Sequence, residues 1–251
     1  MRAPVDNIVA PLFPTKLPWV NGGPKSIIQQ GRPMLVEFWD FCRPSSLRTL
    51  PYMQAWHDRY AAEGLRVIGV HCPGFEASRP EQAVRDAVER LGIAYPVLID
   101  SELEVWQDYE NEGWPARYLF DGRARLFEYH FGEGAYAETE LAIQELLDVQ
   151  QEPLAPLRAE DAPEAELAPQ TQDQEGAYSG PYEAGGVWAV LEGTGTVTVN
   201  GGDTPGEREL TVSHHGAYPL LEHERHTVGV LDLQIGPGVR CLATCFTPGL
   251  L

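Results

Sequence analysis

The chain has 251 residues, of which 43% are hydrophobic and 22% are charged, a composition typical of a soluble globular protein with one large domain or two ordinary ones. Its 37 acidic residues outnumber its 18 basic residues and give a formal net charge of -19, which opposes non-specific binding to nucleic acid and to anionic lipid. No run approaches the roughly 20 apolar residues of a membrane span, and the proline-interrupted N-terminus has no continuous apolar stretch. We therefore expect a cytoplasmic protein without nucleic-acid partners or a membrane span.

The first half of the chain alternates between strand and helix patterns. Short apolar runs at 34–39 (MLVEFW) and 65–70 (LRVIGV) are typical of strands buried on both faces of a sheet. The residues between them have helical spacing, which ends at Gly64. Together they predict a βαβ unit with a right-handed crossover.

Further elements follow in the same order. A second helix is expected to start at Pro80 and end at Gly92, and a strand at 95–100 precedes a short helix capped by Ser101. The pair Asp121-Gly122 favours a tight turn, so residues 116–120 and 123–131 predict a hairpin. An amphipathic helix is expected over 137–149.

The composition then changes. Residues 151–179 contain four prolines and seven acidic residues against one basic residue, which predicts an extended linker. From residue 180 onward, short segments with alternating polarity are separated by turn residues, which predicts a small antiparallel β-sandwich. The expected organisation is a first domain at 1–150, a linker at 151–179 and a second domain at 180–251.

Four stretches of the first domain carry a resemblance to a known family. They are LVEFWDFC, LPYMQAWHDRYAAEGLRVIGVHCPGFE, LGIAYPVLID and GWPARYLFDGRARLFEYHFGEGAYAETE. In this order they resemble TlpA-like redoxins of the thioredoxin fold, and most of all the DipZ-type thiol-disulfide proteins, over most of residues 20–150. DipZ-type proteins also carry a carbohydrate-binding-module-like sandwich after the thioredoxin domain. The resemblance implies an α/β thioredoxin-like domain followed by an all-β sandwich, and we expect no cofactor.

The family has a CxxC motif where a strand ends and a helix begins, since the helix N-terminus stabilises the attacking thiolate and the second thiol resolves the mixed disulfide. Here the stretch CRPSS holds only Cys42. An ungapped match counted from Trp39 places Arg43 and Ser46 at the two cysteine positions. A shift by one residue makes Cys42 the nucleophile and Ser45 the replacement for the resolving thiol. Neither register provides two thiols.

Other positions of the family match. Pro115 in GWPAR corresponds to the cis-proline that faces the CxxC motif, and with Trp114 and Trp39 it forms the predicted substrate-binding set. Cys72 ends the strand beside the one that leads to Cys42, so the two sulfur atoms lie at the same sheet edge. A displaced Cys42–Cys72 redox pair and two unrelated thiols both remain open.

Three functions are compatible with these residues. Cys42 could act as a single thiol on protein thiols or disulfides, its pKa lowered by the following helix and by Arg43. A peroxidase reaction is less favoured, because Trp39 stands where peroxiredoxins have a threonine. The alternative is a redox-inactive module that holds an extended peptide in the groove at Pro115.

The second domain offers two further patterns. Its histidines do not have the spacing of a cupin metal site, so no metal site is predicted. They are His214, His215, His223 and His226, near Glu222 and Glu224.

Aromatic residues of the kind that stack on sugars are Tyr178, Tyr182, Trp188 and Tyr218. Trp188 lies inside an alternating strand, which favours a core position over sugar binding.

Overall fold

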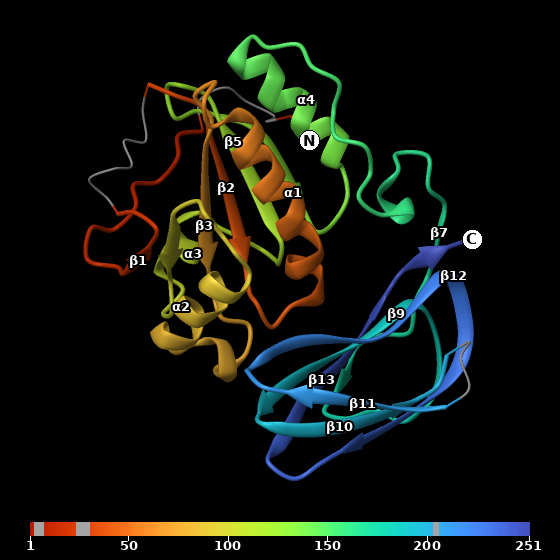
Figure 1. The fold of residues 1–251 in the computed structure, drawn as a ribbon. Coiled ribbons are helices and arrows are strands. Elements are labelled where there is room, and N and C mark those ends of the chain that lie inside the picture. Colours follow the sequence, from red (N-terminus) through yellow and green to blue (C-terminus); the bar gives the residue numbers. More distant parts are fainter. Residues whose placement is uncertain (3–7, 24–30, 203–205) are drawn as a thin grey trace. The chain divides into compact units, whose positions relative to one another are not determined.

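A computed structural model describes residues 1–2, 8–23, 31–202 and 206–251 (Figure 1). The chain divides into two compact units, residues 1–41 with 45–157, and residues 158–251 with Cys42–Pro44. In these described ranges, no helix is both long enough and apolar enough to cross a bilayer.

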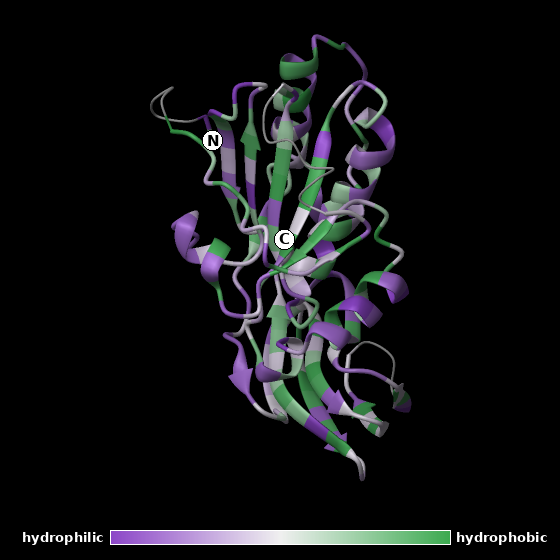
Figure 2. Cartoon of the chain, turned by 90° about the vertical axis from the view of Figure 1, so that its left-hand side faces the viewer, coloured by the Kyte–Doolittle hydropathy of each residue, from purple (hydrophilic) through white to green (hydrophobic). Residues whose placement is uncertain are grey.

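The first unit is built on a six-stranded mixed sheet with the order β1-β4-β3-β2-β5-β6. Its strands are β1 (Trp19–Val20), β2 (Met34–Trp39), β3 (Arg66–His71), β4 (Val97–Ile99), β5 (Ala116–Phe120) and β6 (Leu126–Phe131). Strands β2, β3 and β4 are parallel, whereas β5 runs antiparallel to β2. Every residue of β2 is buried, because helices cover both faces of a central strand. Figure 2 colours the chain by hydropathy, with hydrophobic residues in green.

Helices cover the two faces of this sheet. They are α1 (Pro44–Tyr60), α2 (Glu81–Arg90), α3 (Glu104–Asp108) and α4 (Tyr136–Leu147), with a short 3-10 turn at Glu76–Ser78. Arg117 on β5 lies over the rings of Trp56 and Tyr136, which come from α1 and α4. Phe38 on β2 instead contacts Tyr109 at the end of α3. Helices α1 and α4 therefore pack on one face and α3 on the other (Figure 1). The predicted α/β thioredoxin-like domain is confirmed.

One predicted helix cap is wrong. The backbone N–H of Glu104 at the start of α3 donates to Asp100 Oδ1 at 2.8 Å, whereas Ser101 Oγ donates to the carbonyl of Arg79 at 2.9 Å. Leu103 has a positive φ of 59°, which lies outside the range of a right-handed helix. Helix α3 therefore begins at Glu104, three residues after Ser101. The buried carboxylate of Asp100 satisfies the helix N-terminus from the end of β4.

The second unit is an all-β sandwich, as predicted. Its long strands are β9 (Gly180–Gly193), β10 (Gly195–Asn200), β11 (Glu207–Val212), β12 (Gly216–Ile235) and β13 (Val239–Thr247). Strand β12 pairs with β9 over residues 216–231 and with β10 over 232–235. It therefore joins the β10–β11 pair to the β9–β13 pair. Apolar side chains from all five strands form its core.

Two stretches of the second unit differ from the sequence-based expectation. The first half of β12, residues 216–226, was missed as a strand, because its register shifts at Pro219/Leu221 and Glu222/Thr227 interrupt the alternation of polar and apolar residues. In the predicted linker, β7 (Leu167–Ala168) pairs with β14 (Gly249–Leu250), and β8 (Gln174–Glu175) pairs with β13. Because backbone pairing orders a strand without large apolar side chains, an acidic, proline-rich composition did not reveal these strands.

Candidate functional site

The site follows β2, where the CRPSS stretch leads into α1. The helix begins at Pro44, so Ser45 and Ser46 lie in its first turn and Cys42 lies two residues before it. Ser45 Oγ donates to the carbonyl oxygen of Trp114 at 3.3 Å. The fully buried Ser46 Oγ accepts the backbone N–H of Asp40 at 3.2 Å. Ser45 therefore faces the loop before β5, and Ser46 faces the connection between β2 and α1.

The loop opposite Ser45 contains Trp114 and Pro115, which are joined by a cis peptide bond. Trp114 Nε1 donates to the carbonyl oxygen of Cys72 at 2.9 Å, and the Trp114 ring lies 4.3 Å from that of Trp106 on α3. These contacts fix the position of the loop relative to β3. The structure therefore brings Ser45 next to the loop that contains Trp114 and Pro115.

Trp39 and Arg43 occupy different environments. Trp39 is fully buried, with its ring 5.1 Å from that of His71 in an edge-to-face arrangement, and Gly69 leaves the space that its indole occupies. Arg43 is partly exposed immediately before α1. The structure thus places Trp39 in the core rather than beside the Trp114–Pro115 loop.

Cys42 and Cys72 are both buried, and neither forms a disulfide. Cys72 Sγ lies 3.4 Å from Asp100 Oδ2, to which it donates. Burial raises the pKa of the Cys72 thiol well above its usual value, and the charge of Asp100, its hydrogen bond and the charge of Asp40 raise it further. Cys72 is therefore a protonated hydrogen-bond donor at neutral pH and not a thiolate nucleophile.

Sequence reasoning missed a buried polar group beside this site. Asp40 Oδ2 accepts the backbone N–H of Gly74 at 2.7 Å, and Asp40 Oδ1 lies 3.5 Å from His71 Nε2. Both side chains are fully buried, and the His71 ring stacks on Phe41 at 5.2 Å. The signal in the sequence is an aspartate directly after a buried strand, in FWDF. These contacts hold the β2–α1 connection against the end of β3.

A second missed pair lies inside the sheet. Glu37 on β2 and Arg117 on β5 are register partners, and both are fully buried. Burial raises the pKa of Glu37 to about 8, although the Arg117 charge acts in the opposite direction. Burial also lowers the pKa of Arg117, whose Nη2 donates to the carbonyl oxygen of Gly134 at 2.5 Å. The signal was a glutamate in the middle of the apolar strand MLVEFW.

The chain is similar to known thiol-disulfide proteins in sequence and in fold. No family model matches the chain. DipZ of Mycobacterium tuberculosis is 34% identical over 119 residues, which are 47% of this chain and 17% of DipZ. The thiol-disulfide oxidoreductase ResA of Halalkalibacterium halodurans is 26% identical over 120 residues, or 48% of this chain and 63% of ResA. A crystal structure assigned as the thiol:disulfide interchange protein DsbE of Chlorobium tepidum superimposes with a TM-score of 0.50, at 19% identity, over 57% of this chain and 98% of that one.

The first unit has the thioredoxin-like fold and is similar to thiol-disulfide oxidoreductases, so we refer to it below as the redoxin unit. The region that matches DipZ spans under a fifth of the length of DipZ. Arg43, Ser45 and Ser46 lie around the start of α1, which begins at Pro44.

Outside the redoxin unit, the predicted histidines do not converge. His215 Nδ1 accepts the N–H of Gly193 at 3.2 Å, and His223 Nε2 lies 2.9 Å from Tyr182 Oη. His226 Nε2 lies 3.6 Å from Glu183, and the His214 ring lies 4.8 Å from that of Tyr218. Tyr182 and Tyr218 are buried, whereas Tyr178 and Trp188 are partly exposed. Each histidine thus contacts a different group of the sandwich.

Proposed function

We propose that the redoxin unit binds an extended peptide at the Trp114–Pro115 loop and does not run a dithiol–disulfide cycle. The observation that carries this proposal is the contact of Ser45 Oγ with the Trp114 carbonyl oxygen at 3.3 Å. A hydroxyl group thus lies between the start of α1 and the loop. A dithiol cycle needs two thiols that attack in turn, and the helix start offers serines instead.

Serine does not replace cysteine chemically at this position. A hydroxyl becomes a nucleophile when an adjacent base removes its proton, whereas Ser45 donates its hydrogen bond to a backbone carbonyl. Ser46 is buried and is engaged by the N–H of Asp40. These contacts support a binding surface rather than a covalent reaction.

Exposed backbone groups near such a loop can pair with an extended peptide, and neighbouring side chains then select its sequence. Trp114 is partly exposed and is held by its hydrogen bond to Cys72 and by the Trp106 ring. A loop that is fixed in this way loses little conformational entropy when a peptide binds. The relatives that carry thiol-disulfide names fit a scaffold that recognises protein substrates.

A second function rests on Cys42, a thiol that forms no disulfide, in the connection between β2 and α1. In this alternative, Cys42 exchanges with a partner disulfide as a single thiol. Its position two residues before α1 leaves it outside the first helical turn, where a thiolate gains most from the helix N-terminus. We therefore favour peptide binding over single-thiol exchange.

The experiment is a selection of linear peptides from a random display library on the full chain, followed by affinity measurements. Ser45→Arg places a long side chain against the loop, and Gln172→Arg adds the same charge at an exposed position of the second unit. We expect Ser45→Arg to weaken the selected peptides about tenfold or more and Gln172→Arg to leave them unchanged. Equal affinity for both variants, or no selected peptide, would overturn the proposal.

A further inference from the structure

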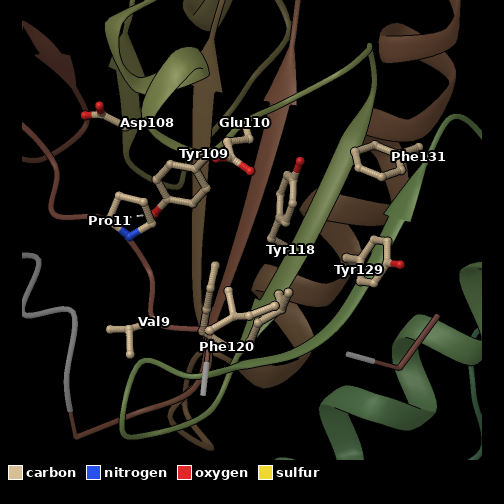
Figure 3. Close-up of a pocket in the computed structure, with 11 residues that line it drawn as sticks. Val9, Pro11, Asp108, Tyr109, Glu110, Tyr118, Phe120, Tyr129 and Phe131 are labelled. Carbon is tan, nitrogen blue, oxygen red and sulfur yellow. Dashed lines mark hydrogen bonds between the residues drawn. The ribbon is translucent and has the colours of Figure 1, made fainter. Parts of the chain in front are cut away.

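The redoxin unit contains a cavity of about 430 Å³ that is separate from the Ser45–Trp114 site. Its walls come from the N-terminal segment, the end of α3 and strands β5 and β6 (Figure 3). Aromatic rings dominate the walls: Tyr109, Tyr118, Phe120, Tyr129 and Phe131. This volume lies within the range of roughly 300–1,000 Å³ that is typical of small-molecule sites.

The aromatic walls are held in place before any ligand binds. Tyr118 Oη donates to Asn111 Oδ1 at 2.8 Å, and Tyr109 Oη donates to the carbonyl oxygen of Pro11 at 3.4 Å. The Phe131 ring packs edge-to-face on Tyr118 at 5.9 Å and lies 5.6 Å from that of Tyr129. A preformed cavity of this kind binds a ligand with little loss of side-chain entropy.

Exposed apolar side chains also lie among the lining residues. Ile8, Val9 and Phe131 line the cavity and are 40%, 58% and 42% exposed. Apolar side chains that gather at one exposed place mark a site of interaction more often than single exposed ones do. The apolar surface therefore continues from the cavity to its mouth.

The charges of the lining are of one sign. Among the residues that the structure describes, the lining includes the carboxylates of Asp108 and Glu110 and no lysine or arginine side chain. In Figure 3 the Glu110 carboxylate lies between the rings of Tyr109 and Tyr118, whereas Asp108 points away from the cavity. The faces of aromatic rings carry partial negative charge and attract cations, and an adjacent carboxylate adds to this attraction.

We propose that this cavity binds a small organic cation with an apolar body, such as an alkylated ammonium group attached to an aromatic ring. The rings enclose the apolar part and Glu110 pairs with the positive charge. An anion of the same shape is excluded, because it would face a carboxylate with no basic side chain in the lining. This site is independent of peptide binding at the Trp114–Pro115 loop, and either can fail without the other.

The test is an NMR titration of the full chain with three ligands of similar shape: benzyltrimethylammonium, benzyl alcohol and benzylsulfonate. We expect the cation to bind about tenfold or more tightly than the alcohol and to shift the resonances of the cavity tyrosines, while the sulfonate causes no shift. Equal affinity of the cation and the alcohol, or no shift of these resonances up to about 10 mM cation, would overturn the proposal.

Two variants separate a specific site from general attraction to an acidic protein. Glu110→Gln removes the carboxylate at the cavity, and Glu89→Gln removes an exposed carboxylate on α2. We expect Glu110→Gln to weaken the cation about fivefold or more and Glu89→Gln to have no effect. Phe131→Leu keeps an apolar side chain but removes a ring, and we expect it to weaken the cation more than the alcohol. Equal effects of the two Glu→Gln variants would overturn the assignment.

Discussion

Glu37 on β2 lies directly opposite Arg117 on β5, and both side chains are fully buried within the sheet of the redoxin unit. Neither carboxylate oxygen of Glu37 has a hydrogen-bond partner among the described residues. The Arg117 guanidinium lies over the Tyr136 ring at 4.9 Å. Burial without hydrogen bonds disfavours the charged carboxylate, which is why the pKa of Glu37 rises to about 8.

This raised pKa predicts a pH-dependent stability. Glu37 titrates near 4.5 in an unfolded chain and near 8 in the folded one, so the folded state keeps a proton that the unfolded state releases between these values. The stability from this proton is fully present below pH 4.5 and is lost as the pH rises through 8. Urea unfolding at several pH values across this window measures the effect.

Glu37→Gln removes the titrating group and keeps its shape. We expect the variant to lose less stability than the wild type between pH 5 and pH 8.5, by a difference of a few kcal/mol. Glu89→Gln, on the exposed surface of α2, is the matched control and should follow the wild type. Parallel pH profiles for Glu37→Gln and the wild type would show that Glu37 ionises normally.

Glu140 on α4 predicts a large stability effect. Its Oε1 accepts Arg59 Nη1 at 2.8 Å and Tyr60 Oη at 2.6 Å, and its Oε2 accepts Trp56 Nε1 at 3.2 Å. The side chain is 1% exposed, so Glu140→Ala leaves several buried donors of α1 without a partner. We expect a loss of about 3–5 kcal/mol in the free energy of unfolding, measured by chemical denaturation.

Glu138→Ala is the control for this variant, because Glu138 lies on the exposed side of the same helix. Its expected effect is within about 0.5 kcal/mol of zero. Similar losses of unfolding free energy for the two variants would mean that any Glu→Ala substitution in α4 destabilises the chain, and that the Glu140 contacts are not the cause.

Cys72 should be chemically inert in the folded chain. Its thiol is buried, donates to Asp100 and has a strongly raised pKa, so the thiolate that attacks alkylating reagents is scarce. Iodoacetamide labelling followed by mass spectrometry should modify Cys72 only after unfolding. Rapid labelling of Cys72 in the folded state, or a Cys42–Cys72 disulfide, would instead support the hypothesis that Cys42 and Cys72 form a displaced redox pair.

The sequence predicts the elements whose patterns are local. The apolar runs MLVEFW and LRVIGV became β2 and β3, and the intervening helix begins at Pro44. The Asp121-Gly122 turn connects β5 and β6, because a short loop leaves few alternatives to antiparallel pairing. The loop that contains Trp114 and Pro115 lies beside the start of α1, where Ser45 contacts the Trp114 carbonyl oxygen, and its role in binding stays a prediction.

The remaining features depend on residues that are distant in sequence. Asp100, and not Ser101, caps α3, because β4 ends at a point from which the Asp100 carboxylate can accept the backbone N–H of Glu104. Strand β7 pairs with β14, which lies about eighty residues later, so composition alone suggested a linker. Likewise, the raised pKa of Glu37 follows from helices that cover both faces of β2, which a local pattern does not reveal.

The absence of a dithiol cycle is tested most directly by insulin disulfide reduction in the presence of a small-molecule reductant. The wild type and Cys42→Ser should match the reductant alone. The double variant Arg43→Cys/Ser46→Cys places two thiols at the ungapped family spacing, and it should reduce insulin faster than the wild type. A wild-type rate above that of the reductant, lost in Cys42→Ser, would contradict the account and show that Cys42 performs thiol chemistry.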